Sequence, residues 1–159
     1  MKTIKAILPV IVILLSGLLS SCGEDNPNIS IKAIEHSLFL EIKAYRLAEG
    51  LEGDFSHAFF MVGEAQEYSF KMSRDLVPVS TENLDSHWAE LDELYTLYNR
   101  DAVVLKSSMT SVSGIFADLL ETKGAPESIL ADITQCGVGI EEDPEGSSYI
   151  TLLLAKADS

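Results

Sequence analysis

The stretch Tyr149-Ile-Thr-Leu-Leu-Leu-Ala155 decides the fold, because it places apolar side chains on both faces of an extended chain. A strand with this pattern is covered on both sides, so we expect it at the centre of a sheet. The segment 141–146, with Pro144 and Gly146 as turn residues, connects it to a preceding strand. The two segments together predict an antiparallel strand pair.

The preceding strand alternates in a way that separates its two faces. Cys136, Val138 and Ile140 share one apolar face. Gly137 and Gly139 share the opposite face, where the absence of side chains allows another element to approach closely. We therefore expect tight packing against the glycine face of this strand.

Helical periodicity dominates the chain before these strands. Apolar residues recur at helical spacing in four stretches, residues 31–45, 58–76, 84–98 and 112–119. Asp54 or Ser56 is expected to cap the second helix, and residues 102–105 form a possible short buried strand. Helices first and strands late, with one strand covered twice, predict an α+β fold. Its expected form is an α-β-α sandwich, with a small antiparallel sheet between two helical layers.

The N-terminal residues resemble a bacterial lipoprotein signal. Lys2 and Lys5 form a basic segment, and the apolar run from Ala6 to Leu19 is too short to span a bilayer. The sequence Leu19-Ser-Ser-Cys22 then resembles the lipoprotein box, in which the cysteine thiol takes a diacylglyceryl group. An ordinary cleaved signal with an incidental cysteine is the alternative interpretation.

This interpretation divides the chain into three parts. Residues 1–21 are the expected signal peptide, residues 22–30 a polar tether and residues 31–159 one folded domain. The lipid on Cys22 then attaches the protein to a membrane. Because no Asp follows Cys22 directly, the usual inner-membrane retention mark is missing. We expect a bacterial envelope protein anchored in the outer membrane, on its periplasmic face or at the cell surface.

The charge of the chain excludes one class of partner. The formal net charge is −14, and removal of residues 1–21 leaves nine basic and 25 acidic side chains, a charge of −16. Such a surface repels nucleic acid, whose recognition depends on basic patches. It also repels anionic lipid headgroups, so we expect the membrane to be contacted through the lipid on Cys22 alone.

The cysteine count excludes two further classes. The chain has two cysteines, and with Cys22 carrying lipid, Cys136 has no partner inside the domain. A disulfide framework and a zinc finger are both excluded by that count. Because Cys136 alternates with apolar residues, we expect a buried thiol that reacts slowly.

Four short motifs resemble one family in their order and spacing. They are Leu40-Glu-Ile-Lys-Ala-Tyr-Arg46 followed by Gly50-Leu51, Ala65-Gln-Glu-Tyr-Ser-Phe-Lys-Met72, Gly124-Ala-Pro-Glu-Ser-Ile-Leu130 and Gly137-Val-Gly-Ile140. The family is the CAP superfamily of cysteine-rich secretory proteins, antigen five and pathogenesis-related proteins. The resemblance extends over roughly residues 38–156 and implies the family's α-β-α sandwich, in a degenerate bacterial lipoprotein form.

The resemblance also implies a cavity, which in the family holds two histidines and acidic residues and binds zinc in some members. Thr81, Val103 and Ala125 stand in place of the first histidine, the glutamate and the second histidine. Glu121 lies near the second acidic position, and Tyr68 replaces a further histidine. We expect the first three to converge on one cleft. Because Thr, Val and Ala are not zinc ligands, the sequence predicts no metal and no other cofactor.

Three classes of function remain open. The first is a non-enzymatic binding module on the envelope, since CAP domains are associated with lipid or sterol ligands and with protein partners. The second is a hydrolase or protease using another site, for which Ser80 and His87 are the candidates, although no nucleophile elbow or third group supports it. The third is a purely structural interaction lipoprotein. The sequence favours the first, with no catalytic residue assigned.

Overall fold

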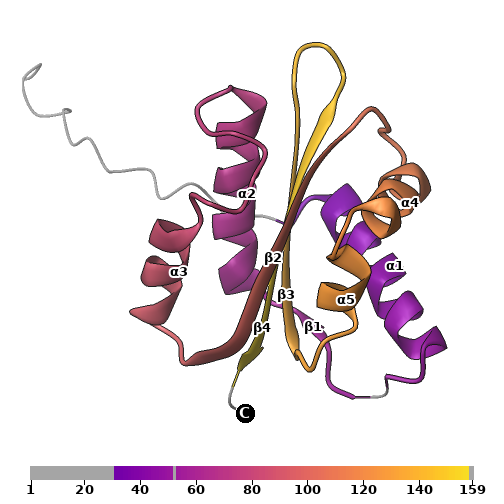
Figure 1. Cartoon of the computed structure of the whole chain (residues 1–159), viewed down its shortest axis with the longest axis vertical. Helices are drawn as coiled ribbons and strands as arrows, with labels where there is room; N and C mark the ends of the chain where they lie inside the picture. Colours follow the sequence, from indigo (N-terminus) through magenta and orange to yellow (C-terminus); the bar gives the residue numbers. More distant parts are fainter. Residues whose placement is uncertain (1–30, 52, 158–159) are drawn as a thin grey trace, which may run out of the picture.

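The computed structural model describes residues 31–51 and 53–157, so the signal, Cys22 and the rest of the tether lie outside the described residues. A four-stranded sheet forms the middle of the molecule, in the order β1-β3-β4-β2 (Figure 1). Its strands are β1 (Ser56–His57), β2 (Leu97–Ser107), β3 (Gln135–Glu142) and β4 (Ser148–Ala157).

Helices cover both faces of this sheet (Figure 1). One layer contains α1 (Ala33–Ala48), α4 (Val112–Glu121) and α5 (Ala125–Ile129), and the other contains α2 (Phe59–Ser73) and α3 (Asp85–Asp92). Each layer has its own cluster of buried apolar side chains against the sheet. The expected α+β sandwich is therefore confirmed. Within the described residues, no helix is both long enough and apolar enough to cross a bilayer.

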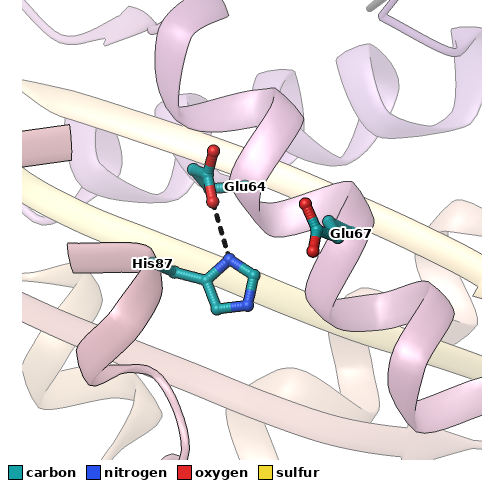
Figure 2. A group of neighbouring side chains, drawn as sticks. All are labelled: Glu64, Glu67 and His87. Carbon is teal, nitrogen blue, oxygen red and sulfur yellow. Dashed lines mark hydrogen bonds and ion pairs between the residues drawn. The ribbon is translucent and has the colours of Figure 1, made fainter. Parts of the chain in front are cut away.

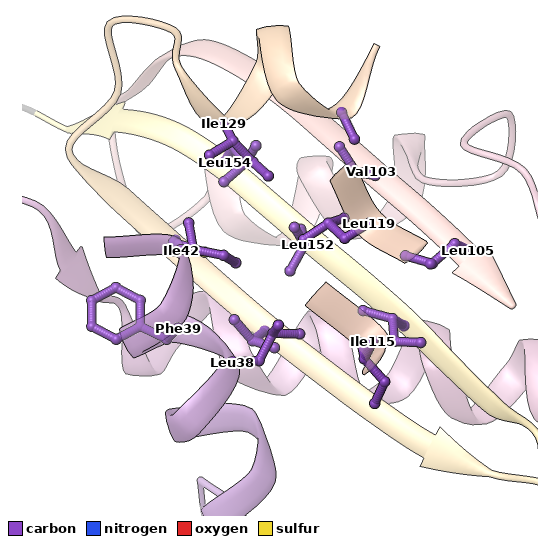
Figure 3. Packing of buried hydrophobic residues seen from close by; sticks show 14 of the residues in the cluster. Leu38, Phe39, Ile42, Val103, Leu105, Ile115, Leu119, Ile129, Leu152 and Leu154 are labelled. Atoms are coloured by element: carbon purple, nitrogen blue, oxygen red, sulfur yellow. The ribbon is translucent and has the colours of Figure 1, made fainter. Parts of the chain in front are cut away.

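Strand β4 is central, as its sequence predicts. It pairs with β3 on one side and β2 on the other, both antiparallel. Leu152 and Leu154 point into the layer of α1, α4 and α5, where they meet Leu119 and Ile129 (Figure 3). Leu153, between them, belongs to the opposite cluster. Every residue from 148 to 155 is buried, which explains the unbroken apolar pattern.

The glycine face of β3 lies directly against α2. A Cβ atom added at Gly137 would lie 2.5 Å from the Cβ of Met61, and one at Gly139 would lie 2.2 Å from the backbone carbon of Ala65. Real Cβ atoms essentially never approach other atoms so closely, so these two positions admit no side chain without moving the helix. The expected close approach is confirmed, and its partner is α2.

The sheet is mixed rather than purely antiparallel, which corrects the sequence prediction. Ser56 and His57 form β1 and pair in parallel with Gln135 and Cys136 of β3. Ser56 is therefore a strand residue, and the N-cap of α2 is Ala58 without a side-chain hydrogen bond. A strand of two residues is too short to leave a periodic pattern, so no sequence signal indicates it.

The third helix and its neighbouring strand also differ from expectation. Helix α3 ends at Asp92, and Tyr98 lies in β2, whereas the sequence predicted helix through Tyr98. Strand β2 starts at Leu97 because it pairs with β4 as far as Ala157, a non-local contact that overrides the local helical spacing. The possible short strand at 102–105 is thus the middle of an 11-residue one.

Candidate functional site

A cleft of about 460 Å³ lies along the outer edge of β2. Because β2 pairs only with β4, its other edge is the margin of the described sheet. Asp101, Ala102, Val103 and Val104 line the cleft in succession. Successive strand residues point to opposite faces, so the cleft straddles the edge and opens between the two helical layers.

The positions expected to converge do so at this cleft. Thr81 reaches it from the segment before α3, Val103 from β2 and Ala125 from the start of α5. Their spacing in the sequence does not show this proximity, which comes from the two helical layers meeting at the edge of β2. Glu121 is not part of the lining: it is an exposed residue at the end of α4.

The lining of the cleft mixes apolar and polar groups. Asp101 is held by two hydrogen bonds: its Oδ2 accepts from the Ser128 hydroxyl at 2.5 Å, and its Oδ1 accepts from the Ala102 backbone N–H at 2.8 Å. Glu82 and Lys123 add one charge of each sign. No lining residue is a histidine or a cysteine, so the lining offers no nitrogen or sulfur ligand for zinc.

A second group of polar side chains lies between α2 and α3. Glu64 and Glu67 are three residues apart on one face of α2, and His87 faces them from α3 (Figure 2). One ligand atom from each lies within 4.8 Å of the others. The sequence indicated His87 only as a possible partner of Ser80 and did not identify this group. The two helices are brought together only by folding, so no spacing in the sequence reports the cluster.

The histidine of this cluster is buried and held on both ring nitrogens. His87 is 2% exposed. Its Nδ1 lies 2.6 Å from Oε2 of Glu64, and its Nε2 lies 3.3 Å from Nζ of Lys71. An ammonium group can only donate, so Nε2 must accept and Nδ1 must carry the proton that is donated to Glu64. Lys71 also forms an ion pair of 2.7 Å with Glu67.

The Tyr68 ring fixes the position of the imidazole. It meets the His87 ring edge-on at a centroid distance of 5.4 Å, and its hydroxyl donates to the Ser80 carbonyl at 2.6 Å. Burial raises the pKa of Tyr68, which favours the neutral phenol. Tyr68, Lys71 and His87 border a second cavity of about 370 Å³.

Ser80 and His87 belong to different cavities. Ser80 lines the cleft at β2, whereas His87 lines the cavity beside α2. The ring nitrogens of His87 are engaged by Glu64 and Lys71, and in the described chain no hydrogen bond joins them to Ser80. The arrangement therefore lacks the contact that a serine nucleophile and its base require.

Cys136 and His57 lie side by side in the paired strands β3 and β1 and illustrate how burial acts on titratable groups. Cys136 is fully buried, and desolvation raises the pKa of its thiol to about 12, which agrees with the expected unreactive cysteine. His57 stacks on Phe39 at 4.8 Å, and both its ring nitrogens are buried without a hydrogen-bond partner. Burial, assisted by nearby His36, lowers the pKa of His57 to about 4.

Comparison with known proteins gives a likeness to a solved structure. No family model matches the chain, and no curated protein matches it. Among solved structures, an outer surface protein from Borrelia burgdorferi has a similar fold, with a TM-score of 0.67 and 13% sequence identity. The alignment covers 82% of this chain and 97% of that protein. At this identity the likeness shows a shared α+β fold and nothing finer.

Proposed function

We propose that this chain is a lipid-anchored bacterial envelope protein whose CAP-like domain is a non-enzymatic binding module. The anchor is inferred from Leu19-Ser-Ser-Cys22 and the basic and apolar residues before it. The shared fold with a protein described as an outer surface protein supports an envelope location. The module holds its ligand in the cleft at β2.

One observation carries the proposal. Thr81, Val103 and Ala125 were selected from the resemblance to the CAP cavity, and all three line one cleft. They come from three separate segments of the chain, so a wrong alignment would be expected to scatter them. The cleft's side chains supply no nitrogen or sulfur metal ligand and no histidine for acid–base chemistry, which favours binding over catalysis.

The lining favours an extended segment of a partner protein over a lipid chain. A lipid tail requires an apolar pocket, but Glu82, Asp101 and Lys123 bring charges to this one. The cleft follows four consecutive residues of an edge strand, where a partner strand can add by backbone hydrogen bonds. In the free protein, the Asp101 carboxylate accepts from the N–H of Ala102, which protects the edge from unwanted pairing.

Site-specific photo-crosslinking in cells tests this function. A photoreactive amino acid at Thr81 is expected to give an adduct with a protein, and the same substitution at exposed Ala48, on α1, is the control. An Ala102→Pro change, which removes an N–H from the edge strand, should abolish the adduct. Equal adducts at Thr81 and Ala48, or a co-purified lipid displaced by bulky residues at Thr81, would refute the protein-binding cleft.

The anchor is tested separately. Cys22 is the residue expected to carry the acyl chains, so Cys22→Ala should release the protein from the membrane fraction or leave it uncleaved. Cys136→Ala is the matched control and should remain with the membrane, because that thiol is buried inside the domain. Correctly processed Cys22→Ala protein that still partitions fully with membranes would show that the anchor is wrong.

A further inference from the structure

We propose that Glu67 and Nε2 of His87 bind a divalent transition ion such as zinc, while Glu64 holds the His87 ring in place. Carboxylates and imidazole are ligand types that zinc takes, and one atom from each of these three side chains lies within 4.8 Å of the others. The site lies between α2 and α3 (Figures 1 and 2), whereas the cleft lies at the edge of β2. It is therefore independent of the proposed function.

The imidazole is oriented as a metal ligand requires. Glu64 accepts the Nδ1 proton of His87, which leaves Nε2 as the nitrogen with an available lone pair. Metal-binding histidines commonly donate their other nitrogen to a carboxylate, which fixes the tautomer and strengthens the ligand. Because His87 is buried and packs against Tyr68, the ring reaches this orientation before any ion arrives.

A cation already occupies the position between Nε2 and Glu67. The Lys71 ammonium lies 3.3 Å from Nε2 of His87 and 2.7 Å from Oε1 of Glu67, so both acceptors point toward one positive charge. Lys71 is a partly exposed side chain on α2, one helical turn after Glu67, and pairs of this kind contribute little to stability. An incoming ion displaces the ammonium into solvent and takes both acceptors.

The ligand set indicates which ions fit. An imidazole nitrogen with carboxylate oxygens favours zinc and its transition-metal neighbours over magnesium and calcium, which take oxygen ligands alone. Two protein ligands leave the remaining coordination positions to water. The adjoining cavity of about 370 Å³ gives room for that water.

Titration of the full chain with zinc, monitored by calorimetry, tests the site. The variants include one expected to weaken zinc binding and one expected to tighten it. Wild-type protein should bind one zinc ion, and Glu67→Gln should weaken binding about tenfold or more. Lys71→Met should tighten it about threefold, because it removes the competing cation. Glu90→Gln changes an exposed carboxylate of α3 outside the cluster and should have no effect.

Glu67 is half exposed, so its substitution does not endanger the fold. The cobalt-loaded wild-type protein should show an absorption spectrum typical of cobalt with one nitrogen ligand. His87→Gln should eliminate that spectrum. The proposal is overturned if zinc does not bind, if Glu67→Gln binds as tightly as wild type, or if Lys71→Met fails to tighten binding. Equal affinity for magnesium would overturn it as well.

Discussion

The two helical layers cover the same sheet, but their buried polar groups serve different purposes. In the layer of α1, α4 and α5, two buried charged groups bond to backbone atoms: Glu35 accepts from the N–H of Ile140, and Arg46 donates to the carbonyls of Ile129, Ala131 and Ile133. In the layer of α2 and α3, the buried His87 instead bonds to two side chains, Glu64 and Lys71. The first arrangement completes a fold, whereas the second retains acceptors that a ligand can use.

The Glu35 contacts show how completely the first layer is committed to structure. Strand β1 covers only the first two residues of β3, so the β3 edge beyond Cys136 lacks a strand partner in the described sheet. The buried Glu35 carboxylate accepts from Ile140 N–H at 3.1 Å and from the Gln66 amide at 2.7 Å. With a further bond from Lys32 N–H, both carboxylate oxygens are engaged within the fold.

The largest effect is expected at the contact of α2 with β3. Gly139→Val places a side chain where the backbone of Ala65 lies within 2.2 Å, so the helix has to move. We expect a loss of about 3 kcal/mol or failure to fold, measured by urea denaturation. Gly146→Asn, in the open turn at φ +85°, is the control. Its loss of unfolding free energy should be a few tenths of the loss at Gly139. A small effect at Gly139 would mean that α2 does not rest on the sheet.

The two cores are compared directly by adjacent substitutions in β4. Leu152 and Leu153 are both fully buried and face opposite layers. Leu152→Ala and Leu153→Ala should each cost about 3 kcal/mol, because each leaves a cavity in a packed core. The measurement is the free energy of unfolding of each variant. A cost below about 1 kcal/mol for Leu153→Ala would show that the layer of α2 and α3 is loosely packed.

A smaller effect is expected from the buried hydroxyl of α2. Ser69 lies 3.0 Å from the Gly139 carbonyl and 2.8 Å from the Thr151 hydroxyl, so it donates to the first and accepts from the second. Ser69→Ala should cost about 1–2 kcal/mol, because both partners are then left unsatisfied. The double change with Thr151→Val should cost less than the sum of the single changes. Simple additivity of the two would show that the hydroxyls do not interact.

The effect that is smallest at neutral pH concerns a titrating histidine. The pKa of His57 is about 4 in the folded protein against 6.5 for the free group, so the neutral ring is favoured by folding. Its contribution to stability is complete above pH 6.5 and is lost as the pH falls toward 4. In His57→Phe, the urea concentration at the unfolding midpoint should fall less than in wild type as the pH is lowered from about 7 to about 4. His36→Gln should change the decline less, because burial is the larger cause of the lowered pKa, and parallel curves for wild type and His57→Phe would contradict the shift.

The sequence predicted the elements whose signal is apolar and regular. The central place of residues 149–155, the two faces of β3 and the buried Cys136 all follow from alternation, which the fold preserves. Strand β1 and the early end of α3 were missed, because both depend on pairing with distant strands.

The two candidate sites also differ in whether the sequence could predict them. The convergence of Thr81, Val103 and Ala125 was reachable from the sequence, because an ordered set of motifs supplied their register. The cluster of Glu64 and His87 was not, because neither helix alone shows which face meets the other. The spacing of Glu64 and Glu67 on one helical face was the one available signal, and it is also common on solvated helices.

The central place of β4 has a consequence for how such a protein crosses a membrane. Strand β4 follows every other described helix and strand in the sequence, yet both hydrophobic cores close on it. A chain that has emerged only as far as residue 147 has helices but no completed core on either side, so it remains an open polypeptide. Secretion channels pass unfolded chains, so for the envelope protein proposed above this order of elements would delay folding until β4 has passed through.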